Sequence, residues 1–109
     1  MNNLKKNLFD LTGRVAIITG GTGLLGQQHA EAIASAGGIP VLADICLEGV
    51  DPDNREWKER FGDLACAIKA DITKPDSVKA LLADVLACYS RVDILINNAG
   101  LGHKAKFHK

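Results

Sequence analysis

Long apolar runs are missing from this sequence of 109 residues, and none approaches the roughly 20 residues that a membrane-spanning helix needs. A secretory leader is not expected either, because no apolar core follows Lys5 and Lys6. Neither sign of charge predominates, since 13 basic residues balance 13 acidic ones. This balance gives no electrostatic reason to bind nucleic acid or an anionic membrane surface. We therefore expect a cytoplasmic protein with neither nucleic acid nor a membrane as its partner.

Cysteine is scarce and irregularly spaced. The three cysteines, Cys46, Cys66 and Cys88, form no Cys-x-x-Cys pair. Such spacing favours reduced thiols over a disulfide framework or a metal site. The length allows at most one domain, with a modest core.

The chain is organised around a glycine-rich stretch near its start. The apolar run from Val15 to Ile18 suits a strand that is buried on both faces. Gly20, Gly21, Gly23 and Gly26 follow Thr19, and apolar residues then recur at helical spacing as far as Gly37. A strand, a glycine turn and a helix together can hold the pyrophosphate of a dinucleotide, because the N-terminal end of the helix faces the anion. The alternative is a purely structural tight turn, which also collects glycine.

A second buried strand is predicted from Ile39 to Ala43, and it ends at Asp44. An acid at this place can accept both hydroxyls of the adenosine ribose, and it repels a 2′-phosphate. The positions where a phosphate-binding cation could lie, Gly21, Thr22 and Ile45, carry no charge. NAD is therefore expected as the cofactor in preference to NADP. The alternative reading of Asp44 is a solvated acid at a strand end.

The middle of the chain predicts a helix that starts at Asp51-Pro52, and then a third strand from Leu64 to Ala70 that ends at Asp71. Thr73 with Asp76 resembles a capping box at the start of a helix over residues 74–89. Apolar residues recur through that helix at helical spacing and predict a stripe that packs in the core against the sheet: Val78, Leu81, Leu82, Val85, Leu86 and Tyr89. A fourth strand is predicted from Val92 to Ile96.

Two motifs in these elements resemble those of the short-chain dehydrogenase/reductase family. The pattern Thr19-Gly20-x-x-Gly23-x-x-Gly26 resembles the family's TGxxGxxG motif, in the spacing of its extended branch. The string from Asn97 to Gly100, Asn-Asn-Ala-Gly, resembles a hallmark of the short branch. The branch stays open between these two, but the order of elements matches the family throughout residues 9–100.

The resemblance implies an α/β fold, a partial Rossmann fold with a parallel sheet of order 3-2-1-4 and helices on both faces. Residues 1–100 would form an NAD(P)-binding domain, and residues 101–109 an irregular basic tail. In the family, an acid like Asp71 binds the adenine amino group beside the backbone of a residue like Ile72; the alternative for Asp71 is a plain pre-helix acid. The predicted cofactor-binding residues are Gly20, Thr22, Gly23, Leu24, Leu25, Gly26, Asp44, Ile45, Asp71, Ile72, Asn98, Ala99 and Gly100.

Family enzymes use the tyrosine of a Tyr-x-x-x-Lys pair as their proton donor. The only tyrosine here is Tyr89, and four residues later stands Asp93. We therefore expect no catalytic residue and no metal site in this chain. It resembles the cofactor half of an NAD-dependent oxidoreductase that interconverts an alcohol and a ketone. The chain would be either truncated or the product of a split reading frame. The resemblance implies that its intact relatives are homo-oligomers that act on small molecules. The alternatives are a non-enzymatic NAD-binding module and the remnant of an interrupted gene.

Overall fold

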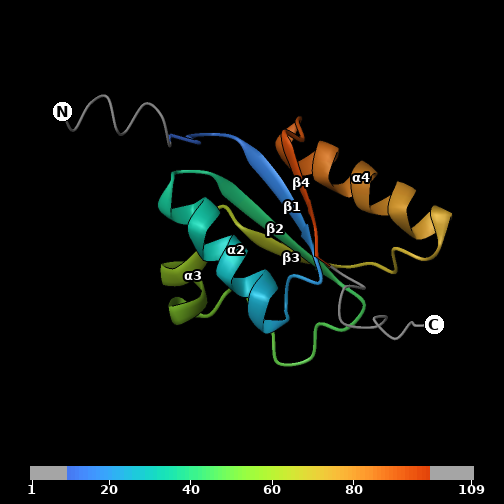
Figure 1. Cartoon of the computed structure of the whole chain (residues 1–109), viewed down its shortest axis with the longest axis horizontal. Coiled ribbons are helices and arrows are strands. Elements are labelled where there is room, and N and C mark those ends of the chain that lie inside the picture. Colours follow the sequence, from blue (N-terminus) through green and yellow to red (C-terminus); the bar gives the residue numbers. More distant parts are fainter. Residues whose placement is uncertain (1–9, 99–109) are drawn as a thin grey trace.

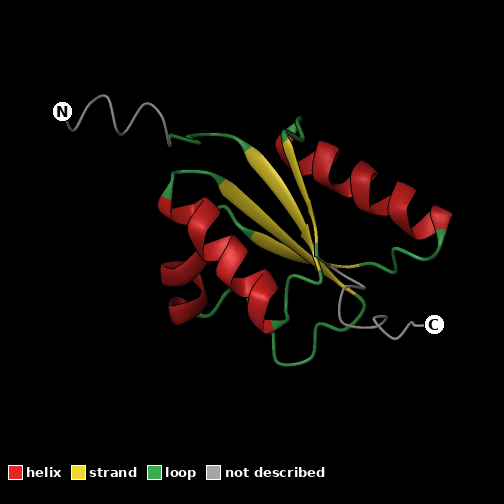
Figure 2. Cartoon of the chain, viewed as in Figure 1, coloured by secondary structure: helices red, strands yellow, loops and turns green. Residues whose placement is uncertain are grey.

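The computed structural model describes residues 10–98, and its core is one parallel sheet covered by helices on both faces (Figures 1 and 2). The predicted basic tail, residues 101–109, lies outside the described residues. The strands follow the order β3-β2-β1-β4, so the predicted fold class and sheet order are confirmed. The elements are β1 (Val15–Thr19), α2 (Leu24–Ser35), β2 (Ile39–Asp44), α3 (Arg55–Phe61), β3 (Cys66–Lys69), α4 (Pro75–Tyr89) and β4 (Ile94–Asn97). In the described part of the chain, no helix combines the length and apolarity of a membrane span.

Strand β1 lies inside the sheet, between β2 and β4, and all five of its residues are buried. Its side chains alternate between two apolar layers, as a strand covered on both faces requires. One layer joins the sheet to α2 and α3 through Ile18, Ala30, Leu42 and Phe61. The other joins it to α4 through Val15, Ile17, Val41, Leu81 and Val85.

The apolar stripe predicted along α4 is only partly buried. Leu81 and Val85 lie in the core, but Leu82 and Leu86 leave 41% and 50% of their surface exposed. The prediction that they belong to the core was wrong. Helix α4 packs on the sheet through Leu81 and Val85, which join a cluster with residues of β1 and β2. No other described element covers the outer side of α4 (Figure 1). Leu95 of the edge strand β4 is also 65% exposed.

One predicted helix start was wrong, and one predicted capping motif is absent. Helix α3 begins at Arg55 and not at Asp51-Pro52, since the Asn54 side chain caps it by accepting from the N–H groups of Glu56 and Trp57. Helix α4 begins at Pro75 without a side-chain cap, so the predicted capping box is absent. Strands β3 and β4 are shorter at their starts than predicted, beginning at Cys66 and Ile94.

Asp93 ties the start of β4 to the start of β1. Its carboxylate accepts a hydrogen bond of 2.8 Å from the N–H of Val15. Arg91 donates two more, each of 2.8 Å, from its guanidinium. The Arg91 bonds, followed by the Val15 N–H, hold the pKa of Asp93 below its ordinary value. The ionised carboxylate therefore stabilises the pairing of β4 with β1.

This contact predicts a pH-dependent loss of stability in the variant Asp93→Asn. Because the folded-state pKa is lowered, the stabilisation is present above the ordinary aspartate pKa and is lost as the pH falls through the lowered one. We expect Asp93→Asn to melt several degrees below the unaltered chain at pH 7, and the difference to shrink in acid. Asp84→Asn, on the exposed side of α4, serves as the control. Thermal melts that differ equally at neutral and acid pH would contradict the assignment.

Candidate functional site

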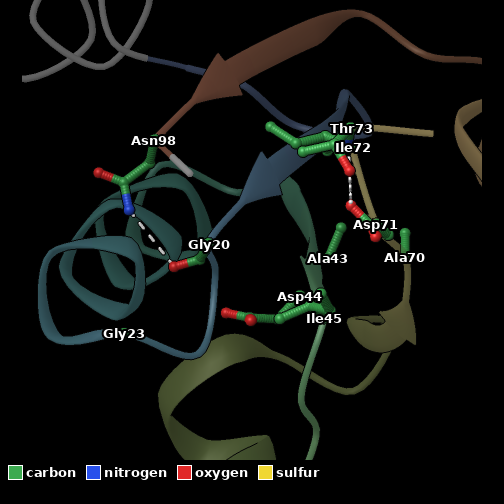
Figure 3. Close-up of a pocket in the computed structure, with 10 residues that line it drawn as sticks. All are labelled: Gly20, Gly23, Ala43, Asp44, Ile45, Ala70, Asp71, Ile72, Thr73 and Asn98. Carbon is green, nitrogen blue, oxygen red and sulfur yellow. Dashed lines mark hydrogen bonds between the residues drawn. The ribbon is translucent and has the colours of Figure 1, made fainter. Parts of the chain in front are cut away.

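A pocket of about 360 Å³ lies at the edge of the sheet where the parallel strands end. Figure 3 shows side chains from three of these ends and the glycine turn around it. The carboxyl edge is where open parallel sheets bind their ligands, because the connections leave a crevice there. The lining residues are Gly20, Gly23, Ala43, Asp44, Ile45, Ala70, Asp71, Ile72, Thr73 and Asn98.

The glycine turn lets α2 start directly beside the end of β1. A Cβ on Gly26 would lie 2.2 Å from the carbonyl oxygen of Gly20, so no other residue fits there without a shift of the backbone. Gly23, the N-cap residue of α2, has room for a side chain, because a Cβ there would approach only the carbonyl oxygen of Gly20, at 3.5 Å. Helix α2 has no side-chain cap and no acid in its first turn. Its N–H groups and positive dipole end are therefore free to face an anion.

Asp44 closes one side of the pocket from the end of β2. One of its oxygens, Oδ2, accepts two hydrogen bonds from Thr22: 3.1 Å from the N–H and 2.6 Å from the hydroxyl. The other oxygen, Oδ1, accepts a longer bond of 3.3 Å from the Cys46 N–H. The carboxylate is thus oriented by the glycine turn, across 22 residues of sequence.

Asp71 follows the end of β3 and lies in a small turn of its own (Figure 3). Its Oδ1 accepts bonds of 3.0 Å and 2.6 Å from the N–H and hydroxyl of Thr73, while its own N–H donates to the Ser77 hydroxyl. The Thr73 hydroxyl, and then the Thr73 N–H, lower the pKa of Asp71 below its ordinary value. Asp71 is therefore held as an ionised acceptor.

The end of β4 is clasped to the end of β1. The Asn98 side chain donates to the carbonyl oxygen of Gly20 at 3.3 Å (Figure 3), and its N–H donates to the Thr19 hydroxyl at 3.0 Å. Asn97 accepts from the same hydroxyl at 3.0 Å. These two asparagines therefore hold the end of β4 against the end of β1. The predicted site residues Ala99 and Gly100 lie outside the described residues.

The remaining predicted site residues fall into two groups. Seven of them line the pocket: Gly20, Gly23, Asp44, Ile45, Asp71, Ile72 and Asn98. Four do not: Thr22 acts on Asp44, Gly26 is packed against Gly20, and Leu24 and Leu25 are 80% and 50% exposed on the first turn of α2. The role of all of them in holding a cofactor stays a prediction. No group of residues suited to a metal ion occurs within residues 10–98.

Sequence reasoning missed three pocket residues, namely Ala43, Ala70 and Thr73. A signal for the two alanines was present, because the tripeptide Ala-Asp-Ile occurs at the ends of both β2 and β3. Alanine before each acid keeps the crevice open where a larger side chain would fill it. The signal for Thr73 was its position two residues after Asp71, where a hydroxyl commonly bonds back to an aspartate.

Comparison with known proteins agrees with this geometry. A family model described as short chain dehydrogenase matches residues 14–109. A short chain dehydrogenase/reductase of Colletotrichum higginsianum is 35% identical over 101 residues, which are 93% of this chain and 37% of that protein. The chain thus spans between 14% and 37% of the length of the relatives it matches.

Solved structures share the fold as well as the sequence. The NADPH-dependent 3-quinuclidinone reductase of Rhodotorula rubra matches with a TM-score of 0.72 and 32% identity, over 83% of this chain and 34% of that one. The 3-ketoacyl-(acyl-carrier-protein) reductase of Brucella melitensis, complexed with NADH, matches with a TM-score of 0.66 and 36% identity, over 79% and 34%. The chain belongs to the short-chain dehydrogenase family of oxidoreductases, which bind a nicotinamide dinucleotide.

The tight contact at Gly26 predicts different effects for two neighbouring substitutions. Gly26→Ala forces a Cβ into the Gly20 carbonyl, and we expect it to lower the free energy of unfolding by about 2–3 kcal/mol. Gly23→Ala meets only an ordinary contact and should cost less than about 1 kcal/mol, as a poorer helix cap. Denaturant unfolding of both variants measures the difference. Equal losses of stability would show that the close approach does not constrain the turn.

Proposed function

We propose that this chain is the NAD-binding portion of an oxidoreductase that interconverts an alcohol and a ketone. The observation that carries the proposal is the pocket at the carboxyl edge of the sheet, which has an uncapped helix on one side and two strand-end acids on the other. A bound nicotinamide would supply the hydride acceptor or donor. The residues of this chain would bind and orient the dinucleotide.

The residues present suit the parts of such a cofactor. The open space above Gly23 and the free N-terminal end of α2 suit the pyrophosphate, with Leu24 and Leu25 exposed beside it. Asp44 suits the adenosine ribose, because its Oδ1 can accept from a hydroxyl. Asp71 suits the adenine amino group, because its Oδ2 accepts no hydrogen bond from another described residue. Asn98 shapes the backbone at the far end of the pocket.

The preference for NAD over NADP rests on charge. The relatives leave this choice open, since one similar structure is NADPH-dependent and another is complexed with NADH. Asp44 is a carboxylate at the place where the 2′-phosphate of NADP would come. The nearest positions that could compensate, Gly21, Thr22 and Ile45, carry no charge. Two like charges brought together in a pocket repel each other strongly.

Titration with the two cofactors tests this proposal. We expect the unaltered chain to bind NAD⁺ at least about tenfold more tightly than NADP⁺, since one like-charge contact costs more than about 1.4 kcal/mol in a partly buried site. Changing Asp44→Ala together with Ile45→Arg should narrow or reverse the preference. Asp63→Ala removes an exposed acid before β3 and should leave it unchanged. Identical titration curves for the two cofactors in the unaltered chain would refute the preference.

We further propose that this chain alone does not complete the reaction. Its only tyrosine, Tyr89, is at the end of α4, and its hydroxyl donates to the carbonyl oxygen of Leu64 at 2.5 Å. Leu64 precedes β3, whereas the pocket lies beyond the far end of that strand. Burial is the main cause that raises the pKa of Tyr89 above its ordinary value. Tyr89 is therefore poorly placed and poorly suited to donate a proton to a substrate.

The corresponding prediction concerns activity. The chain of 109 residues should bind NAD⁺ and yet reduce none of it above background with a panel of secondary alcohols. Absorbance of NADH at saturating cofactor is the measurement, and Tyr89→Phe should make no difference to it. A rate that Tyr89→Phe abolishes would make Tyr89 catalytic. A rate that survives the change would mean that another group in the chain moves the proton.

A further inference from the structure

A chain of hydrogen bonds links α3 to the acid at the end of β2. Arg60 of α3 contacts α2 twice, through Glu31 at 2.8 Å and through the side-chain oxygen of Gln27 at 2.9 Å. Gln27 in turn donates from its side-chain nitrogen to the carbonyl oxygen of Thr22 at 2.7 Å. Thr22 then donates twice to Asp44. The network thus joins two helices, the glycine turn and a strand end.

The direction of each bond in this network is determined by chemistry. A guanidinium can only donate, so the Gln27 atom that meets Arg60 is its oxygen. The Gln27 nitrogen is therefore left to donate to the Thr22 carbonyl. The bond from Gln27 fixes the position of the Thr22 carbonyl group. The N–H and the hydroxyl of Thr22 both donate to the same oxygen of Asp44, Oδ2.

The two oxygens of Asp44 consequently differ. Oδ2 receives both bonds from Thr22, while Oδ1 receives only the 3.3 Å contact from the Cys46 N–H. Oδ1 is the oxygen with acceptor capacity to spare, and the Thr22 bonds determine where it lies. A 2′-phosphate would be tolerated only if the carboxylate turned away, and those bonds oppose this rotation.

We infer that Thr22 is a specificity-determining positioning residue, held in place by Gln27 and Arg60, which fixes Asp44 toward the ribose and so enforces the choice of NAD over NADP. The inference rests on the proposed cofactor function and adds to it. Selectivity would then depend on the orientation of the carboxylate as well as on its charge. Loss of the Thr22 hydroxyl should weaken selectivity even though Asp44 remains.

The test measures the dissociation constants of NAD⁺ and NADP⁺ for the full chain and two Thr22 variants, with a thermal melt of each. Thr22→Val keeps the shape and the N–H but removes the hydroxyl, and Thr22→Ser keeps the hydroxyl. A hydrogen bond to a charged group corresponds to about tenfold in an equilibrium constant. We expect Thr22→Val to lower the ratio of the NADP⁺ to the NAD⁺ dissociation constant by about tenfold, and Thr22→Ser to restore it within about twofold. A folded Thr22→Val protein with the original ratio overturns the inference.

A second pair of variants tests the support behind Thr22. Gln27→Met removes the bond to the Thr22 carbonyl, whereas Gln28→Met changes an exposed neighbour on the same helix. We expect Gln27→Met to lower the ratio of the NADP⁺ to the NAD⁺ dissociation constant by about threefold. This effect is weaker than that of Thr22→Val because the Thr22 hydroxyl remains. Gln28→Met should leave the ratio unchanged. If Thr22→Val does not fold, this pair decides, and equal ratios for the two variants overturn the inference. Failure of the unaltered chain to bind either dinucleotide refutes the proposed function itself, and this inference with it.

Discussion

The close approach of helix α2 to the end of β1 is the contact on which the rest of the site depends. A Cβ at Gly26 would lie 2.2 Å from the Gly20 carbonyl oxygen, so the helix comes as near to the turn as a backbone can. That approach aims the free N–H groups of α2 at the carboxyl edge of the sheet. It also brings Thr22 within reach of Asp44 and Gln27. The absence of a side chain at Gly26 is therefore required by both the candidate anion site and the candidate ribose site.

Parallel pairing then assembles the other side of the pocket. Thr19 pairs with Ala43 of β2 and with Asn97 of β4, so these three strands end side by side at the same edge of the sheet. Asp44 pairs with Lys69 of β3, which sets Asp71 beyond the same edge. Because neighbouring parallel strands end at the same edge, residues 22 to 79 positions apart in the sequence meet there.

The similarity to an NADPH-dependent reductase and to a reductase complexed with NADH shows that this scaffold accommodates either cofactor. Under the proposed function, the choice between the two cofactors depends on the side chains at the end of β2. In this chain those side chains are an acid and the threonine that orients it, tied by Gln27 and Arg60 to the helices behind them. On the inference drawn above, such a link would make cofactor selectivity depend on helix packing as well as on the residues that line the pocket.

The sequence by itself determined the order of elements and the residues that end them. The sequence was enough to predict the buried strands, the glycine turn and the polar residues at the strand ends, Asp44, Asp71 and Asn98. Each of these depends on a pattern within a single element. Only the tertiary structure decided which parts of an element another one covers. It left Leu82 and Leu86 of α4 exposed, because periodicity reports the apolar side of a helix and not the breadth of the surface that meets it. It also directed the Thr22 hydroxyl to Asp44, 22 residues away in the sequence. A polar side chain bonds to whichever partner the fold brings closest, and its own segment does not specify that partner.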